Sequence, residues 1–394
     1  MNSIFNLNFL AENSKNIFDF ITKNFDGMSG GDVAKMLAMW VIGGVLIFLA
    51  IKKDMEPSLL LPMGFGAILC NLPNSGAIGA DGPLTTLYNA GINNELFPLL
   101  LFIGIGAMID FEPMLANPKL MLFGAAAQFG IFMTLSLAAF VFGNITEAAA
   151  IGMIGAADGP TAIVVANTLK SSQVGSITVA AYSYMALVPI IQPPVIRLLT
   201  TKHERLIRMP YKPQSVSKLT KILFPIFVTI VAGLVAPASV ALIGFLMFGN
   251  LLRECGVLGS LSETAQNVLA NLITLVLGLV VASQMQYAKF LQWSTLIILA
   301  LGLFAFVFDT AGGGLFSKFF NLFAKLYNVF AKEKINPMIG AAGISAFPMS
   351  SRVIHKMALK EDPQNFILMQ SVAVNVSGQI ASVIAGGLIL GYFG

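Results

Sequence analysis

Charged residues are scarce in this chain. They make up 11% of the 394 residues, whereas 56% are hydrophobic; soluble domains average roughly 25% charged residues. The net charge of +4 is too small to indicate binding to nucleic acid. The composition therefore predicts an all-α polytopic membrane protein, embedded in a lipid bilayer and without a nucleic-acid partner.

Cysteine and histidine are almost absent. Cys70 and Cys255 both stand in apolar surroundings, which favours two small buried side chains over a disulfide or a metal framework. His203 and His355 are too few and too far apart to indicate a metal site. Secretory signal features are also missing at the N-terminus, where residues 1–34 mix apolar and charged side chains. This pattern predicts an amphipathic segment on the membrane surface.

Apolar runs divide the rest of the chain into two halves. A basic stretch, 201–221, separates a first transmembrane repeat, 35–200, from a second, 222–394, and its lysines and arginines place it in the cytoplasm. The Lys52-Lys53 pair predicts a second cytoplasmic end. The expected spans are Met36–Ile51, Pro57–Leu72, Leu96–Ile109, Leu120–Phe142, Val174–Leu199, Ile222–Ala236, Pro237–Leu252, Val268–Ser283, Trp293–Phe308 and Phe366–Phe393.

Two further apolar regions are interrupted, and they resemble each other. The first break, Ala148–Leu169, contains Met-Ile-Gly-Ala-Ala from Met153, and the second break, Asn336–Met357, repeats these five letters from Met338. Each copy is followed by glycine and proline, which interrupt a helix. Paired interrupted segments in corresponding halves indicate a binding site near the middle of the membrane.

The first break places a carboxylate, Asp158, directly before Gly159-Pro160. An ionisable residue and open backbone carbonyls at membrane depth are tolerated where they line an enclosed, wet cavity. The alternative interpretation is that Asp158 only caps the half-helix that starts at Pro160. Asp81 has the same Asp-Gly-Pro context but follows a polar loop, which favours a turn or cap near the membrane surface.

Together the two breaks offer oxygen ligands. Asp158 and Thr161 come from the first break, and the second adds the side chains of Asn336, Ser345, Ser350 and Ser351. One carboxylate with neutral oxygens favours a hard monovalent cation such as Na+ over a divalent or transition metal. A proton would compete with that ion for Asp158.

Two other polar residues allow more than one interpretation. Asn375 lies inside the last span, where hydrogen bonding between helices is the favoured interpretation from the sequence alone. Arg352 follows the second break, where its charge would either bind an anion or mark a helix end near the membrane surface. The spacing does not decide between these two roles.

At these residues the chain resembles the beta subunits of the sodium-translocating, biotin-dependent decarboxylases, which act on oxaloacetate, methylmalonyl-CoA or glutaconyl-CoA. The likeness covers nearly the whole chain. Its most specific parts are Gly155-Ala156-Ala157-Asp158-Gly159-Pro160-Thr161, Asn336-Pro337-Met338-Ile339-Gly340 and Pro363-Gln364-Asn365-Phe366.

The resemblance implies a subunit that decarboxylates carboxybiotin and exports Na+ while a proton is consumed. It implies an elevator-like arrangement of two inverted repeats, with a core that moves against a scaffold. The implied partners are a biotin carrier/carboxyltransferase alpha subunit and a small gamma-type membrane subunit, in an oligomeric assembly of the inner (cytoplasmic) membrane. Carboxybiotin, carried by a partner, and Na+ are the implied cofactor and cargo.

The resemblance also assigns roles to residues. Asp158 matches an aspartate that takes part in Na+ binding and proton movement, and Tyr184 falls where the family has a functional tyrosine. The positions that match the family's Na+ site are Asp158, Asn336, Gly340, Ser345 and Asn375. Arg352 matches the same conserved region, which suggests that it holds the carboxylate of carboxybiotin. The residues alone fit a Na+-coupled secondary carboxylate transporter equally well.

Overall fold

A computed structural model describes residues 22–209, 215–327 and 334–394. Most of the predicted N-terminal segment, residues 1–21, lies outside the described residues, as do 210–214 of the basic linker. The helices of the first half are α2 (Gly30–Lys53), α3 (Pro57–Cys70), α4 (Pro83–Gly91), α5 (Leu96–Met108), α6 (Glu112–Ala116), η1 (Pro118–Leu120), α7 (Met121–Ala127), α8 (Phe129–Phe142), α9 (Ile145–Gly152), η2 (Met153–Ala156), α10 (Gly159–Thr168) and α11 (Val174–Leu199).

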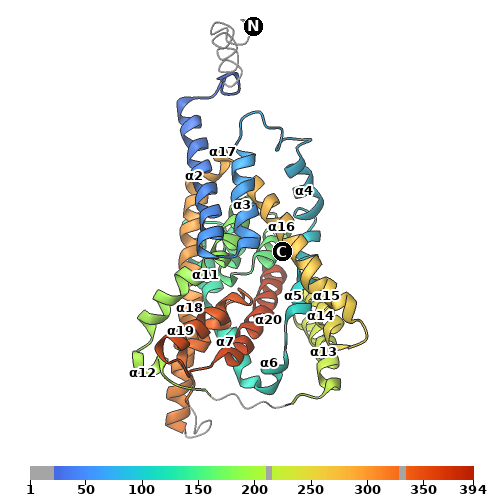
Figure 1. Cartoon of the computed structure of the whole chain (residues 1–394), viewed down its shortest axis with the longest axis vertical. Coiled ribbons are helices and arrows are strands. Elements are labelled where there is room, and N and C mark those ends of the chain that lie inside the picture. The colour runs from blue at the N-terminus through green and yellow to red at the C-terminus, as the bar shows by residue number, and fades with distance from the viewer. Residues whose placement is uncertain (1–21, 210–214, 328–333) are drawn as a thin grey trace, which may run out of the picture.

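The second half is also helical. Its helices are α12 (Lys202–Arg205), α13 (Lys218–Val235), η3 (Pro237–Ser239), α14 (Val240–Glu254), α15 (Gly259–Glu263), η4 (Thr264–Leu269), α16 (Ala270–Val281), η5 (Ala282–Gln284), α17 (Tyr287–Phe290), α18 (Trp293–Tyr327), η6 (Pro337–Gly343), α19 (Met349–Glu361) and α20 (Leu368–Phe393). In Figure 1, α2 and α3 stand at one end of the molecule, and α13, α14 and α15 form a group to one side beside α5.

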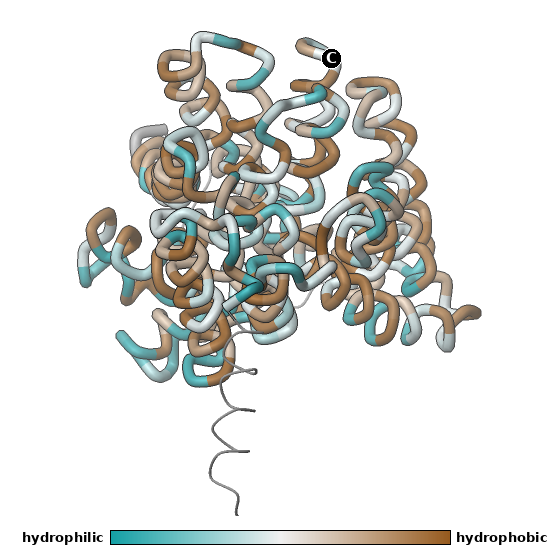
Figure 2. Tube along the Cα trace, turned by 90° about the horizontal axis from the view of Figure 1, so that it is seen from above, coloured by the Kyte–Doolittle hydropathy of each residue, from teal (hydrophilic) through white to brown (hydrophobic). Residues whose placement is uncertain are grey.

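The described residues contain no strand, and seven of their helices are long and apolar enough to cross a membrane. An eighth span is possible if α4 and α5, bent by 66°, are counted together. Figure 2 shows hydrophobic residues on the outermost helices as well as on the central ones. Large apolar side chains such as Phe140, Leu198 and Leu234 are 80% or more exposed. The prediction of an all-α polytopic membrane protein is confirmed.

Several spans differ from those expected. Pro57–Leu72 and Pro237–Leu252 are not among the seven candidates, and Leu96–Ile109 counts only together with α4. Two further runs have other bounds than expected. The run Leu120–Phe142 is divided at Gln128, where α7 ends and α8 begins. By contrast, α18 is longer than expected: it does not end near Phe308 but continues through Gly312-Gly313-Gly314. A Cβ on Gly312 would lie 2.9 Å from the carbonyl oxygen of Ala126, so the triplet is a close-packing surface inside a helix.

Both copies of the repeated motif adopt the same local structure. Met153–Ala156 forms the short 3-10 helix η2, and the copy from Met338 lies in the 3-10 helix η6. η2 ends at Ala157, whose φ of 51° is left-handed, and η6 ends where the chain becomes extended at Ile344. Each break therefore contains a 3-10 helix, which is followed by an α-helix (α10 after η2, α19 after η6). The inverted relation of the two halves stays a prediction.

Glycines mark two groups of tightly packed helices. In the first group, α3 packs on α2 and α16, and α5 packs on α14 and α16. The backbones approach closely because glycines at these contacts have no Cβ (Gly43, Gly64, Gly66, Gly104, Gly106, Gly249 and Gly278). In the second, α7, α8, α18, α20 and both breaks pack together in the same way (Gly124, Gly130, Gly155, Gly312, Gly313, Gly340, Gly343 and Gly378). The division into a scaffold and a core, and motion between them, stay predictions.

The basic linker is attached to the end of α19. Arg205 forms an ion pair of 2.8 Å with Glu361, and Arg208 forms one of 2.6 Å with Asp362. The backbone carbonyls of Arg205 and Ile207 accept hydrogen bonds from the side-chain amides of Asn336 and Asn365. The second break is thus fixed to the linker that the charge pattern places in the cytoplasm.

Candidate functional site

The two breaks meet. The backbone N–H of Ser345, just after η6, donates a hydrogen bond of 3.1 Å to the carbonyl of Ala156, the last residue of η2. Both residues are buried, as are their neighbours along η2 and η6. We call this contact the junction. It brings open backbone from two segments, almost two hundred residues apart in sequence, to one place.

Asp158 lies just past the junction, at the start of α10, with only 3% of its surface exposed. Its Oδ2 accepts three side-chain hydrogen bonds, from Thr161 Oγ1 (2.7 Å), Gln379 Nε2 (2.9 Å) and Ser382 Oγ (3.0 Å). Its Oδ1 accepts one long bond of 3.4 Å, from the N–H of Thr161. Asp158 therefore does cap α10, but the cap leaves most of the capacity of Oδ1 unused.

One face of α20 connects Asp158 with the second break. Asn375, Gln379 and Ser382 follow one another at spacings of four and three residues, so their side chains share that face. Gln379 and Ser382 donate to Asp158, while Asn375 Nδ2 donates to the carbonyls of Ile344 (2.7 Å) and Ala342 (3.1 Å). A single helix thereby holds the carboxylate of the first break and the backbone of the second.

Two amide oxygens near the second break lack partners. Asn375 Oδ1 and Gln128 Oε1 are buried and accept no hydrogen bond from any described residue. Gln128 Nε2 donates to the carbonyl of Gly343 at 3.4 Å, and Ser345 Oγ donates to the carbonyl of Gly378 at 3.0 Å. Buried polar atoms are normally paired. Two free amide oxygens beside crowded carbonyls form a donor set suited to a hard cation.

The two tyrosines of α11 point in different directions. Tyr184, the predicted functional tyrosine, donates its hydroxyl to the carbonyl of Leu299 in α18. Tyr182 packs its ring on Gly159, where an added Cβ would lie 2.6 Å from Cζ. Its hydroxyl is buried and has no partner in the described part of the chain. Tyr182, rather than Tyr184, therefore lies directly against the segment that carries Asp158.

Asn336 and Gly340 lie at the far end of the second break from Ser345. Asn336 caps η6 through an acceptor bond from the N–H of Met338 (3.0 Å) and donates to the linker carbonyls described above. Gly340 packs backbone to backbone on Gly313 of α18. Their described contacts hold η6 in place, and none of them reaches Asp158.

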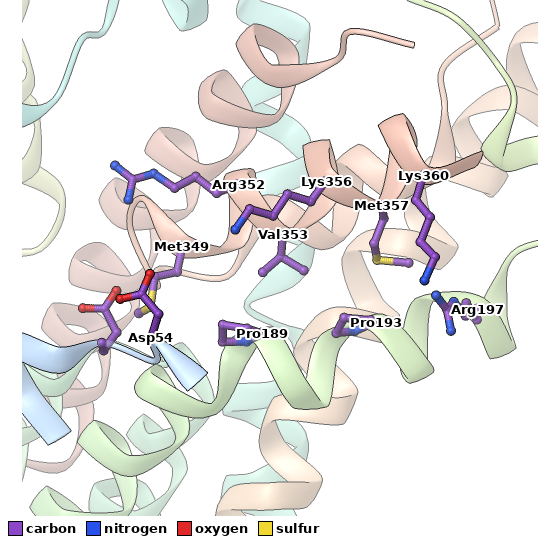
Figure 3. Close-up of a pocket in the computed structure, with 11 residues that line it drawn as sticks. Asp54, Pro189, Pro193, Arg197, Met349, Arg352, Val353, Lys356, Met357 and Lys360 are labelled. Carbon is purple, nitrogen blue, oxygen red and sulfur yellow. The ribbon is translucent and has the colours of Figure 1, made fainter. Parts of the chain in front are cut away.

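Arg352 lines a pocket of about 330 Å³ between α11 and α19. Figure 3 shows Arg352, Lys356 and Lys360 along α19, and Arg197 on α11. Asp54 and Glu56, from the turn after α2, contribute the acidic side chains. Burial raises the pKa of Glu56, and the charge of Arg352 opposes that rise. The pocket lies between the turn that follows Lys52-Lys53 and α19, whose C-terminal end forms ion pairs with the basic linker. Both regions are predicted to be cytoplasmic.

The other acids considered from the sequence occupy surface positions. Asp81 is exposed, and the N-cap of α4 is Gly82, without a side-chain hydrogen bond, so Asp81 does not cap that helix. Glu112, the first residue of α6, pairs with Lys221 at the start of α13. The hydrogen bond from Lys221 holds the pKa of Glu112 below its usual range.

Comparison with known proteins identifies the family. Residues 35–393 match the sequence profile described as the Na+-transporting oxaloacetate decarboxylase beta subunit. The chain belongs to this family. The methylmalonyl-CoA decarboxylase subunit beta of Propionigenium modestum is 45% identical over 404 residues, covering 96% of this chain and 99% of the relative.

Members of this beta-subunit family named for other acids are about equally similar. The glutaconyl-CoA decarboxylase subunit beta of Acidaminococcus fermentans is 46% identical over 356 residues (90% of this chain, 92% of the relative). The probable oxaloacetate decarboxylase beta chain of Vibrio cholerae is 44% identical over 417 residues (90% and 94%). Sequence identity is therefore shared across the beta subunits and does not depend on the acid for which each relative is named.

Within this beta-subunit chain, the sequence interpretation missed four polar residues near the junction. Gln379 and Ser382 bond to Asp158, and the signal for them was their helical spacing from Asn375. Gln128 lies inside the expected span Leu120–Phe142, and only the structure places it at the second break. Asp309 is fully buried in α18. It was missed because the helix was expected to end one residue earlier.

Proposed function

We propose that this chain is the membrane subunit of a decarboxylase sodium pump, which decarboxylates carboxybiotin and couples this step to Na+ export with H+ consumption. The observation that carries the proposal is the junction. There, a buried carboxylate with one nearly free oxygen lies beside two interrupted helices, in a chain of the Na+-transporting decarboxylase family. The same oxygen atoms serve Na+ and H+ in turn.

The chemistry requires a proton at a defined place. When the bond between the ring nitrogen of biotin and its carboxyl carbon breaks, CO2 leaves and the electron pair stays on nitrogen. That nitrogen then takes up one proton, so each turnover consumes one. A buried acid that exchanges Na+ for H+ links this demand to ion movement.

The Na+ site is assembled from both breaks and α20. Asp158 Oδ1 supplies the charged ligand, and Asn375 Oδ1 is a buried amide oxygen without another partner. Ser345, whose N–H forms the junction, contributes its hydroxyl. Asn336 and Gly340 stay predicted members of the site, and their contacts position η6. Tyr184 stays a predicted functional residue, for a second ion or for the proton relay.

The pocket at Arg352 receives the carboxyl group of carboxybiotin. Four cationic side chains against two acids give it a positive balance, and an arginine guanidinium matches a carboxylate in a bidentate way. The partners follow from the family: an alpha subunit that carries biotin and a small gamma-type subunit, assembled as an oligomer in the inner (cytoplasmic) membrane. The basic linker faces the cytoplasm in this arrangement.

Changing Arg352→Ala should weaken the use of carboxybiotin and leave the ion site unchanged. Losing one charge-assisted hydrogen-bonded contact of about 1.5–3 kcal/mol corresponds to a roughly ten- to hundredfold rise in KM for the biotinylated carrier. The Na+ concentration that gives half-maximal rate should not move. Arg253→Ala in α14 is the matched control, because Arg253 contacts the carbonyl of Met108 and not the pocket. Equal KM values for the two variants would contradict the assignment.

The function itself is tested on the assembled complex. The chain is expected to co-purify with a biotin-carrying protein on monomeric avidin, and the purified complex should show Na+-stimulated decarboxylation that free avidin abolishes. Reconstituted into liposomes, it should move Na+ only while the acid is consumed. Transport of a carboxylate by the chain alone, without a biotin-carrying partner, would instead identify a secondary carboxylate transporter.

A further inference from the structure

A second buried acid lies close to the junction and has no part in the site described so far. Asp309, in the middle of α18, is fully buried, and neither of its carboxylate oxygens makes a hydrogen bond of ordinary geometry with a described residue. No ion pair reaches it within the described ranges. An unpaired carboxyl group inside a membrane protein indicates a functional site.

Asp309 lies between the two breaks. On α18, Gly302 packs against Ile154 of the first break, and Gly313 packs against Gly340 of the second. These two glycines are eleven residues apart, close to three helical turns, so they share one face of the helix. Asp309 is on that face, seven residues after Gly302 and four before Gly313. The carboxyl group is therefore at the level of the junction.

One backbone segment separates Asp309 from the first break. Gly130, at the start of α8, lacks the Cβ that would collide with the Asp309 carboxylate. The same residue packs against Gly155, whose added Cβ would lie 2.8 Å from the carbonyl carbon of Gly130. Gly155 is three residues before Asp158. The backbone of Gly130 thus separates the Asp309 carboxylate from Gly155 of the first break.

The surroundings of Asp309 suit a proton better than a metal ion. The groups that approach its carboxylate are the backbone N–H groups of Gly130 and Ile131, in the first turn of α8. N–H groups cannot bind a cation, but the positive end of a helix stabilises an anion. A buried carboxyl group without an ion-pair partner is stable when protonated. The surroundings of Asp309 therefore stabilise both its ionised and its protonated form.

Few ionisable groups can substitute for Asp309. Four of the elements that pack against α18 carry no ionisable side chain, namely α7, α8, η2 and η6. On the remaining ones, α11 brings Tyr182, Tyr184 and Arg197, α9 brings Glu147, and α17 brings Tyr287 and Lys289. Tyr184 donates to Leu299, and Glu147 accepts from Ser171 and Ser172. Lys318, on α18 itself, pairs with Glu204.

We propose that Asp309 is a second proton-binding group, which takes up and releases a proton beside the junction during turnover. The inference rests on the proposed function, since decarboxylation of carboxybiotin consumes a proton. It assigns Na+ and H+ exchange to Asp158, and proton binding without Na+ binding to Asp309.

The first test needs no variant. A lipid-soluble carbodiimide reacts with protonated buried carboxyl groups, and mass spectrometry of the labelled wild-type complex locates each adduct. Adducts are expected at Asp158 and Asp309, formed faster as the pH falls, with Na+ protecting Asp158 but not Asp309. Absence of an adduct at Asp309 at every pH would overturn the proposal. Protection of Asp309 by Na+ would also overturn it, because the residue would then be a Na+ ligand.

The second test measures turnover of the reconstituted complex. Asp309→Asn should lower the decarboxylation rate roughly tenfold or more under alkaline conditions, where protons are scarce, and flatten the dependence of the rate on pH. The Na+ concentration for half-maximal rate should stay unchanged. Thr310→Val is the matched control, since Thr310 is equally buried next to it and its hydroxyl also lacks a partner. A wild-type pH profile in Asp309→Asn contradicts the inference.

The experiments distinguish a failure of the proposed function from a failure of the role of Asp309. If the wild-type complex shows no Na+-stimulated decarboxylation, the proposed function is wrong, whatever the labelling shows. If the wild type is active and Asp309→Asn matches it at every pH, only the role of Asp309 is wrong. If Asp309→Asn does not assemble, the labelling of the wild type decides alone.

Discussion

Replacing Asp158 by asparagine removes Na+-stimulated decarboxylation from the assembled complex. Asparagine has nearly the same size and caps helices as well as aspartate, so the bonds from Thr161 and Ser382 to its oxygen can remain. The charge is lost, and removing one partner of a buried charge pair costs about 3–5 kcal/mol. That corresponds to a fall in Na+ affinity on the order of a hundred- to a thousandfold.

Two measurements check this expectation. The rate of decarboxylation is followed as the Na+ concentration is raised. The Tm of the complex is followed in parallel, because a bound ion stabilises the folded state by an amount that grows with the logarithm of its affinity. Asp158→Asn should keep the Tm seen without Na+ but lose the rise that Na+ produces. The chain supplies its own control in Asp81→Asn, since Asp81 has the same Asp-Gly-Pro context but is exposed. Wild-type Na+ activation in Asp158→Asn would refute the central role of this carboxylate.

Gly378→Ala is expected to destabilise the junction more than any conservative change of a side chain. An added Cβ would collide with the Gly343 carbonyl group, with its carbon 2.7 Å away and its oxygen nearer still. The obstacle is backbone and cannot rotate aside, so α20 and the second break must separate. Overpacking of this kind costs about 3 kcal/mol. The same contact between α20 and the second break includes the hydrogen bonds of Ser345 and Asn375. Separating the two segments should therefore lower both Tm and Na+-stimulated turnover.

The same helix offers a matched control for this change. Gly391 lies near the end of α20, and no atom lies within 4 Å of the position a Cβ would take there. Gly391→Ala should leave Tm and turnover at wild-type values. If Gly378→Ala is as stable and active as Gly391→Ala, the close approach of α20 to the second break is not required.

Much of the fold could be predicted because membrane spans are local features. An apolar run such as Val174–Leu199 is recognisable without its neighbours, and α11 has these bounds. The junction was also accessible: proline and glycine beside Asp158, and a second copy of the motif from Met338, indicated two breaks that meet. A hydrogen bond between Ala156 and Ser345 now connects them.

The parts that were missed depend on contacts between distant segments. Whether α18 stops or continues at three consecutive glycines is decided by what packs on them, and here the neighbours are Ala126 and Gly340. That continuation places Asp309 inside a span. Likewise, nothing local distinguishes Gln379 from any other polar residue of a long helix, and its role follows from the position of Asp158 across the junction.

The glycine contacts around the junction have a consequence for ion size. Where Gly378 meets Gly343, and Gly313 meets Gly340, main chain touches main chain with no side chain between them. Spacing set in this way cannot be relaxed by turning a rotamer, because widening it requires a whole helix to move. A Na+ site of the proposed kind, beside the contact of Gly378 with Gly343, would therefore accept ions of one radius. Discrimination between Na+ and the larger K+ would then reside in the stiffness of the backbone, with the ligand side chains contributing charge and little of the fit.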